Sequence, residues 1–324
     1  MKKIILTLVI LMAFVHAETV RRAAFDIGSG STKMVVADVD TTTNKMTIIY
    51  TQDEKVDYQE ALEGQDSFSK EIRNLGTLTL ATLKWTAIQK GATQFRAVAT
   101  ASFRTAKNGK EFADFISKVL GIHVTIITQE QEAVLGFYGA LAGEDVQAQN
   151  VVVWDIGAGS MQMIALKDNE HVIYKGNLAS VTFANHIIKE IQKKDGNSPN
   201  PISSEEKEKA HKYARGVAKN VPQAIKDKLK DGKTHVLGIG GVHYYSIRGQ
   251  LKMGDKYGIS AFSEALVYNG IGKTDADIGS KYASTEISNM ILVEAFMAEL
   301  GINVVKPKKV NMANGVLLHQ AMWK

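Results

Sequence analysis

The sequence predicts an α/β protein with mixed sheets and two similar domains, and three observations support this fold class. Apolar runs of strand type are interspersed with segments whose apolar residues recur at helical spacing. A strand–loop–strand unit near the start of the chain occurs a second time in its middle. The length of 324 residues suits two domains, and a hydrophobic content of 45% is enough for packed cores.

The repeated unit is the most informative of these features. It begins at Ala23 as AAFDIGSGSTKMVV and returns at Val151 as VVVWDIGAGSMQMIAL. Residues 26–31 align without a gap with residues 155–160, at an offset of 155 − 26 = 129 residues. Because this offset is about the size of one domain, the repeat predicts two similar domains that face each other.

In the first half of the chain, short apolar and β-branched runs predict strands, and apolar residues at helical spacing predict helices. Leu75, Leu78, Ala81 and Trp85 show this spacing in the longest helix, and the tryptophans are expected in the core. The elements expected here are strands at 23–38, 46–50, 95–100 and 123–127, and helices at 68–90, 109–120 and 130–141.

The second half begins with the repeated unit at 151–166. The last strand expected in this half leads into Gly240 and Gly241, which are expected to open a helix. Tyr245 is expected to pack in the core, and lining the cleft is the alternative. The other elements expected here are helices at 183–193, 203–229, 286–300 and 311–322, and a strand at 234–239.

Composition and charge limit the classes of partner. A formal net charge of +5 favours anionic partners only weakly. The chain has no block of Lys and Arg of the kind that binds nucleic acid, so no nucleic-acid partner is expected. The absence of cysteine excludes disulfides and a lipid-anchored lipoprotein.

The first residues have the pattern of a secretory signal peptide. Lys2 and Lys3 precede an apolar stretch at 4–15, and small residues lead up to Ala17. We therefore expect residues 1–17 to be removed after Ala17, leaving an exported protein, most simply in a bacterial periplasm. An uncleaved membrane anchor is the alternative, but the stretch is shorter than the about 20 residues that span a bilayer. After cleavage, no contact with the membrane is expected.

Each repeated loop has the composition of a phosphate-binding turn. Glycine lets the backbone approach a ligand closely, successive amides form a concave anion site, and serine adds hydroxyl donors. One such loop could be an ordinary β-turn, but two matched loops favour phosphate binding. The residues expected to bind phosphate are Gly28, Ser29, Gly30, Ser31, Gly157, Gly159 and Ser160. Asp26 and Asp155 would repel phosphate, so we expect them to act through a divalent cation.

The paired loops resemble those of the actin–sugar kinase–Hsp70 superfamily. More closely, the chain resembles the exopolyphosphatase/guanosine pentaphosphate phosphohydrolase (Ppx/GppA) family, in stretches that occur in the family's order. Besides the two loops, these stretches are AVATASFRTAKNG at 97–109, IITQEQEAVLGFYGAL at 126–141 and LGIGGVHYYS at 237–246.

The resemblance implies two ribonuclease-H-like domains with a basic cleft between them. Domain I would comprise residues 18–128 and about 310–324, and domain II residues 129–309. By position, Glu132 matches the catalytic glutamate that activates water, and Arg104 matches a phosphate-binding arginine. The alternative for Glu132 is an ordinary solvent-facing carboxylate, and the alternative for Arg104 is a surface arginine. Asp155 and Asp26 would hold Mg²⁺, with Mn²⁺ as an alternative. Gly240 and Gly241 would bind a further phosphate at the start of a helix.

Several positions depart from the family pattern. Gln162 replaces a glutamate after the second loop, Ala158 replaces a glycine within it, and Gln131 replaces a glutamate beside Glu132. Near the C-terminus, Ala313 and Asn314 stand where the family has Arg-Glu. Because supporting groups orient the groups that react, these changes raise the question of whether catalysis persists.

Two main classes of function therefore follow, and a third, actin-like assembly or an ATPase, stays open because the sequence does not show filament contacts. The first is an exported, Mg²⁺-dependent phosphoanhydride hydrolase that releases terminal phosphate from inorganic polyphosphate. Guanosine pentaphosphate is the alternative substrate if the signal-peptide prediction is wrong. The second is a non-catalytic protein that binds polyphosphate or nucleotide. Family members often form dimers, so a homodimer is an open alternative.

Overall fold

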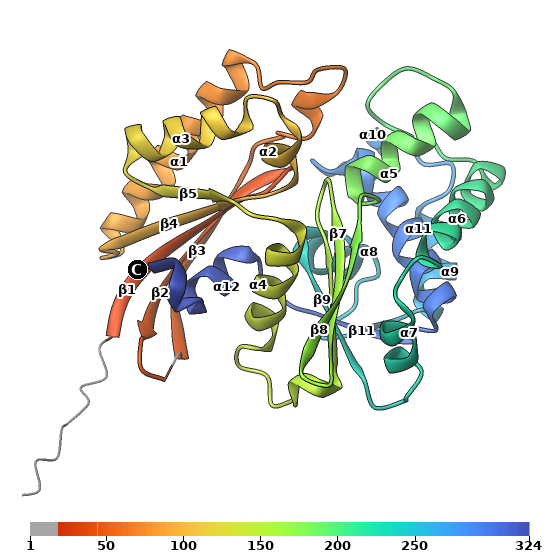
Figure 1. The fold of residues 1–324 in the computed structure, drawn as a ribbon. Helices are drawn as coiled ribbons and strands as arrows, with labels where there is room; N and C mark the ends of the chain where they lie inside the picture. Colours follow the sequence, from red (N-terminus) through yellow and green to blue (C-terminus); the bar gives the residue numbers. More distant parts are fainter. Residues whose placement is uncertain (1–18, 44, 324) are drawn as a thin grey trace, which may run out of the picture.

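The computed structural model describes residues 19–43 and 45–323, and the predicted signal peptide lies outside these described residues. Figure 1 shows two β-sheets, each with helices on both faces, which confirms the predicted α/β class. Helices α4 (Gln129–Leu141) and α12 (Met312–Leu318) lie between the two sheets. Among the described residues, no helix combines the length and hydrophobicity that spanning a bilayer requires.

The first sheet is mixed and has the strand order β3-β2-β1-β4-β5. Its first three strands form an antiparallel meander, while β4 pairs parallel to β1 and β5 pairs parallel to β4. The strands are β1 (Thr19–Ile27), β2 (Ser31–Asp40), β3 (Lys45–Lys55), β4 (Gln94–Ala99) and β5 (His123–Ile126).

The second sheet repeats this arrangement in the order β10-β11-β9-β6-β7-β8. The strands β6, β7 and β8 form an antiparallel meander, and β9 runs parallel to β6. The sequence repeat is thus a repeat of structure. The strands are β6 (Val151–Ile156), β7 (Met161–Lys167), β8 (Glu170–Gly176), β9 (His235–Ile239), β10 (Tyr257–Gly258) and β11 (Val304–Pro307), of which β8, β10 and β11 were not predicted.

The helices cover the outer faces of both sheets (Figure 1). On the first sheet these are α1 (Lys70–Gln89), α2 (Ala101–Thr105) and α3 (Gly109–Leu120). On the second half of the chain they are α5 (Ser180–His186), α6 (Ser204–Ala218), α7 (Gln223–Leu229), α8 (Arg248–Gln250), α9 (Ser260–Asn269), α10 (Asp275–Ile278) and α11 (Ala283–Leu300). Short 3-10 or π segments include η1 (Glu60–Leu62), η3 (Ile187–Gln192) and η4 (Val242–Ile247).

Two helix predictions were wrong in extent. The helix expected at 203–229 is interrupted, because Pro222 caps α7 and lacks the N–H that a continuous helix requires. The helix expected at 311–322 ends at Leu318 and gives way to a 3-10 turn.

The buried face of α1 also differs from the prediction. Leu78 is 68% exposed and Trp85 is 63% exposed, so the expectation that all tryptophans are buried was wrong. The helix instead buries Leu80 and Leu83 against the first sheet. Apolar residues occur on more than one side of α1, so their spacing alone does not identify the side that faces the sheet.

Between the sheets lies a hydrophobic core shared by both halves of the chain. It contains Val35 and Val98 from the first sheet, Ile164 from the second, Phe137 from α4 and Val316 from α12. This layer holds the two sheets so that the repeated loops, which begin at the ends of β1 and β6, lie close together.

Candidate active site

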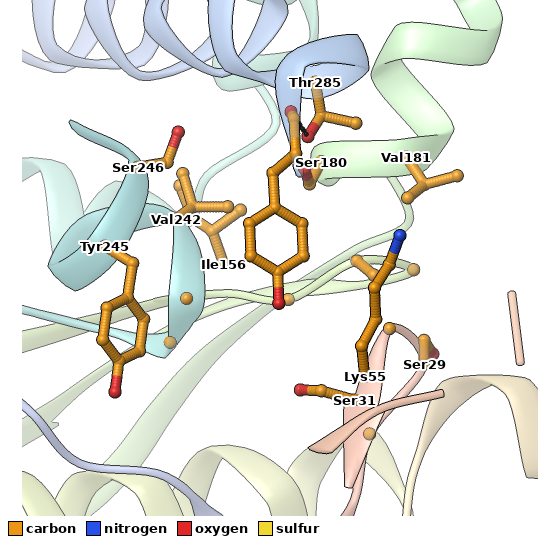
Figure 2. A pocket seen from close by; sticks show the side chains of 18 of the residues that line it. Ser29, Ser31, Lys55, Ile156, Ser180, Val181, Val242, Tyr245, Ser246 and Thr285 are labelled. Atoms are coloured by element: carbon orange, nitrogen blue, oxygen red, sulfur yellow. Dashed lines mark hydrogen bonds between the residues drawn. The ribbon is translucent and has the colours of Figure 1, made fainter. Parts of the chain in front are cut away.

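A cavity of about 460 Å³ lies between the two repeated loops. Figure 2 shows Ser29 and Ser31 of the first loop on one side and Val242, Tyr245 and Ser246 on the other. The cavity is lined by nearly all of the residues predicted from the sequence: Asp26, Gly28, Ser29, Gly30, Ser31, Glu132, Asp155, Gly157, Gly159, Ser160, Gly240 and Gly241. Of the predicted site residues, Arg104 alone does not line it.

The two loops have the same turn geometry. Gly28 N–H donates to the backbone oxygen of Ser31 at 3.0 Å, and Gly157 N–H donates to that of Ser160 at 3.0 Å. The loops also nearly touch. A Cβ on Gly159 would lie 3.1 Å from Ser29 Oγ, and a Cβ on Gly30 would lie 3.3 Å from the Ala158 methyl. The glycines therefore permit two backbones to converge on one small space.

Neighbouring segments hold each loop in place. Ser29 Oγ accepts from Ser102 N–H at 3.2 Å, at the start of α2. In the second loop, the backbone oxygen of Gly157 accepts from Ser180 N–H at 3.1 Å, and that of Ala158 accepts from Val181 N–H at 2.9 Å. The first residues of α2 and α5 therefore hold the two turns in place through these hydrogen bonds.

Gly240 brings a third backbone segment to the cavity. It follows β9, has φ +85°, and a Cβ there would lie 2.5 Å from Asp155 Oδ1 and 2.6 Å from the backbone oxygen of Ile156. Both the backbone conformation and the contact exclude a side chain. The helical segment that Gly240 and Gly241 open continues into η4, as predicted.

Glu132 is buried at the start of α4 and reaches the cavity. A capping box begins this helix, in which Thr128 Oγ1 accepts from Gln131 N–H and the Gln131 side chain accepts from Thr128 N–H. Glu132 itself is only 6% exposed, so the alternative of a solvent-facing carboxylate was wrong. Gln131, which departs from the family pattern, is a capping residue here.

Arg104 binds Glu132. Its Nη1 donates to Glu132 Oε2 at 2.9 Å and to the backbone oxygen of Ile127 at 2.8 Å. This nitrogen is therefore engaged with protein groups beside the cavity. The alternative of an ordinary surface arginine was wrong, and the geometry favours positioning of Glu132 over direct contact with phosphate.

Three buried carboxylates on the cavity have raised pKa values, mainly because of burial. Burial raises the pKa of Glu132 to about 7, although the positive charge of Arg104 acts in the opposite direction. Burial also raises the pKa of Asp155 to about 8, and the negative charges of Glu132 and Asp26 add to this shift. Burial raises the pKa of Asp26 as well, and Lys33 opposes that rise. Such a group of acids favours a bound proton or a cation.

The expectation of a basic cleft was wrong. Eight carboxylate residues line the cavity, against three lysines. The carboxylates are Asp26, Asp53, Glu54, Asp57, Glu60, Glu132, Asp155 and Glu286, and the lysines are Lys33, Lys55 and Lys281. A polyanion entering this cavity is therefore opposed by the excess of negative side chains unless cations accompany it.

The residues present fit a divalent cation that is shared with a phosphate. The described part of the chain contains no group of three His, Asp or Glu side chains arranged to hold a metal alone. Mg²⁺, however, is commonly held by one or two carboxylates together with substrate phosphates and water. Asp155 suits this role, because it lines the cavity and is buried among other acids. Gln162, where the family has glutamate, donates to Ser160 Oγ at 3.1 Å and adds no charge.

Comparison with known proteins decides the family. The sequence matches the Ppx/GppA phosphatase family over residues 35–271, which is most of the chain. The chain belongs to this family. Membership of the Ppx/GppA family indicates an enzyme that hydrolyses phosphoanhydrides, in agreement with the matched loops around the cavity.

Several solved structures share the fold of this chain. The Aquifex aeolicus PPX-GPPA enzyme is 17% identical, with a TM-score of 0.72, covering 93% of this chain and 99% of its own. An exopolyphosphatase from Cytophaga hutchinsonii is 15% identical, with a TM-score of 0.73, and the match covers 93% of this chain and 97% of that one. An exopolyphosphatase-like protein is 17% identical, with a TM-score of 0.76, and the match covers 94% of this chain and 98% of that one. At these identities the likeness establishes the shared fold.

The sequence analysis missed several residues of the cavity. Tyr245 lines the cavity and donates to Asp53 Oδ2 at 3.2 Å, where packing in the core had been expected. Lys55 lies on the same cavity, with its Nζ 5.5 Å from the ring centre of Tyr282. Tyr245 follows the Gly240–Gly241 turn closely, and lining the cleft was the alternative for it. Lys55 has no sequence signal, because it reaches the cavity from a segment far from either loop. Lys33 did have one, since it follows the first loop directly.

Proposed function

We propose that this Ppx/GppA member is an exported, Mg²⁺-dependent exopolyphosphatase in which Glu132 activates the attacking water. The observation that supports this most is Glu132 itself, a buried carboxylate on the cavity between two matched loops. A pKa of about 7 leaves it partly ionised at neutral pH, which suits a general base.

The geometry of the Glu132–Arg104 pair supports this role. Arg104 donates a hydrogen bond to Oε2 of Glu132, and none of the hydrogen bonds among the described residues involves Oε1 of Glu132. The second oxygen is therefore available to accept a proton from water. Arg104 fixes the direction of the carboxylate, and its charge keeps the pKa of Glu132 from rising further.

The proposed reaction transfers a terminal phosphoryl group to water. The water oxygen bonds to the terminal phosphorus, the bridging P–O bond breaks, and the shortened polyphosphate leaves with the electron pair. The proton of the water passes to Glu132. The loop amides and serine hydroxyls of the two turns hold the phosphate oxygens. When bound, Mg²⁺ would supply positive charge to the phosphate from the side of Asp155.

The choice of inorganic polyphosphate rests on the predicted signal peptide. Guanosine pentaphosphate is a cytoplasmic signal, so an exported enzyme would more readily meet polyphosphate. If residues 1–17 are not a signal peptide, guanosine pentaphosphate becomes the favoured substrate.

A non-catalytic binding protein is the second candidate, and two observations favour it. Gln162 contributes no negative charge, and the Ala158 methyl narrows the space beside Gly30.

Phosphate release by the mature chain, from Glu18 onward, tests the proposal. Polyphosphate, guanosine pentaphosphate and ATP would each be supplied with Mg²⁺ or Mn²⁺. We expect metal-dependent release from polyphosphate that is lost in Glu132→Gln. Glu130→Gln is the matched control, because Glu130 lies on the same helix but pairs with Lys175 at the surface. Binding of polyphosphate without release from any substrate would favour the binding protein instead.

A further inference from the structure

A row of large apolar side chains lies on the side of α1 that faces away from the first sheet. Its members follow one another at intervals of three, seven and three residues, which places side chains on one side of an α-helix. They are Leu75, Leu78, Trp85 and Ile88. The side of α1 that packs on the sheet is formed by other residues, Leu80 and Leu83 among them. The packing of α1 therefore leaves this row on the surface.

Helix α3 lies beside α1. Near the starts of the two helices, Arg73 of α1 pairs with Glu111 of α3 at 2.9 Å. Near their ends, Lys84 of α1 donates to the backbone oxygen of Leu120 of α3. The two helices therefore run in the same direction and form one outer layer on the first sheet, on the side away from α4 and α12 (Figure 1).

Helix α3 adds two apolar side chains to this surface. Phe115 and Val119 lie about one helical turn apart, between the two contacts that join α3 to α1. The surface of a monomeric protein rarely gathers so many large apolar side chains in one place without a binding function. We call this surface the α1–α3 face. Its members, each between 44% and 68% exposed, are Leu75, Leu78, Trp85, Ile88, Phe115 and Val119.

Lysines surround the α1–α3 face. Residues 70–90 and 109–120 contain six basic and three acidic side chains, a net charge of +3. The mature chain, without Lys2 and Lys3, has 39 − 2 = 37 basic and 34 acidic residues, also +3, so this layer carries as much net charge as the whole mature chain. The ion pairs of the layer use Arg73 and Lys110. None of the ion pairs among the described residues involves the layer's other basic residues, Lys70, Lys84, Lys90 and Lys118.

This charge decides which partner fits the face. A second copy of the chain would bring two faces of +3 together, and like charges across an interface oppose association. An anionic surface is complementary to the lysines. Side chains that project from two helices enter the headgroup region of a bilayer without a partner of matching shape, and tryptophan is enriched at that depth. A bilayer with anionic lipids therefore fits the face better than a second copy does.

We propose that the α1–α3 face binds the surface of a bilayer that contains anionic lipids. The apolar side chains enter the headgroup region, and the lysines lie at the lipid phosphates. This goes beyond the proposed function, because none of the six apolar residues of the face lines the cavity. It departs from the expectation, made from the sequence, that the cleaved chain has no contact with the membrane.

Cosedimentation of the mature chain with vesicles tests the proposal. We expect binding to vesicles of equal parts phosphatidylglycerol and phosphatidylcholine, weaker binding when NaCl is added, and little binding to phosphatidylcholine alone. Leu78→Gln/Trp85→Gln should weaken binding at least about tenfold, because two apolar side chains no longer enter the bilayer. Val267→Gln/Tyr268→Gln is the matched control, because these side chains of α9 are 68% and 71% exposed in the second half of the chain.

Lysine substitutions test the part played by charge. Lys70→Gln/Lys118→Gln should weaken binding to the anionic vesicles by about 10–30-fold, from the usual contribution of two lysines near an anionic surface. Lys167→Gln/Lys230→Gln, which removes two exposed lysines from the second half of the chain, should bind as wild type does. Tryptophan fluorescence should shift to shorter wavelength on binding, and this shift should disappear in Trp85→Phe.

Folding and activity are followed in the same variants. Melting curves and phosphate release should match wild type, because the substituted residues lie outside the cavity. A wild-type chain that releases no phosphate would count against the proposed function and leave the vesicle result unaffected.

Three results would overturn the membrane proposal. The first is no binding to the anionic vesicles at low ionic strength, or equal binding to neutral ones. The second is equal binding of wild type and Leu78→Gln/Trp85→Gln. The third is a dimer in analytical ultracentrifugation that this double variant dissociates, since a second copy would then cover the face.

Discussion

Arg104 Nη1 lies 2.9 Å from Glu132 Oε2 and 2.8 Å from the backbone oxygen of Ile127. One guanidinium nitrogen thus joins α2, the end of the first sheet and the first turn of α4. The pair sets both the direction and the charge state of the carboxylate that faces the phosphate loops.

The first prediction concerns the pH dependence of turnover. A base must be ionised, so kcat/KM should rise with pH through about 7, the pKa of Glu132. Replacing Arg104 by Gln removes a nearby positive charge, raises the pKa of Glu132 and moves the rising limb to higher pH. A pH–rate profile measures this shift. Arg73→Gln, which breaks a pair with Glu111 outside the cavity, should leave the limb in place.

The second prediction concerns stability. Glu132 has a higher pKa in the folded protein than in the unfolded chain, so the folded state binds more protons between these two values. The stability contributed by the protonated form is therefore present at low pH and is lost as the pH rises through about 7. We expect wild type to unfold at lower urea concentration at pH 8 than at pH 5.5. Glu132→Gln should show a smaller difference in urea midpoint between the two pH values. A difference equal to that of wild type would contradict the raised pKa of Glu132.

The third prediction concerns Gly240. Alanine there requires φ +85° and a Cβ 2.5 Å from Asp155 Oδ1, so Gly240→Ala should lower stability by about 1–3 kcal/mol. Gly241→Ala is the matched control for stability, because a Cβ there has no neighbour within 4 Å and its φ is −64°. Urea denaturation of both variants measures the contrast. Equal stability would mean that the contact with Asp155 is not tight.

The fourth prediction concerns the space between the loops. Ala158 places a methyl where the family has glycine, against Gly30 of the opposite loop. Ala158→Gly should widen the gap and lower KM for polyphosphate, by about tenfold if roughly 1.4 kcal/mol of crowding is relieved. Gly30→Ala should act in the opposite direction. Steady-state kinetics of the two variants test this. A change of KM in the same direction in both would contradict the idea that the Ala158 methyl crowds the phosphate.

The fifth prediction separates the two aspartates. Chelation with EDTA should stop phosphate release, and added Mg²⁺ should restore it. Asp155→Asn should raise the Mg²⁺ concentration needed for half-maximal activity by at least about tenfold. Asp26 Oδ2 already faces Lys33 Nζ at 3.7 Å and accepts from Met312 N–H at 3.3 Å, so Asp26→Asn should lower activity without changing that concentration. A shift in Asp26→Asn as large as that in Asp155→Asn would place both aspartates at the metal, as the resemblance to the family implies.

Local signals explain the successes of the sequence analysis. The two loops were predictable because glycine and serine between apolar strands specify a tight turn from a few neighbouring residues. Glu132 and Arg104 were found only through the resemblance to the Ppx/GppA family. Their contact joins residues 28 positions apart, and no pattern in the residues between them encodes it.

The sequence by itself determined the α/β class, the duplicated hairpins and their phosphate loops, because these depend on composition and short-range spacing. The tertiary structure alone decided which face of α1 is buried, that Lys33 lies on the cavity, and that the cavity is acidic although the chain is basic overall. The physical reason is that burial and electrostatic environment arise from segments far apart in sequence. The eight carboxylates of the cavity come from both halves of the chain and meet only when the two sheets pack against α4 and α12.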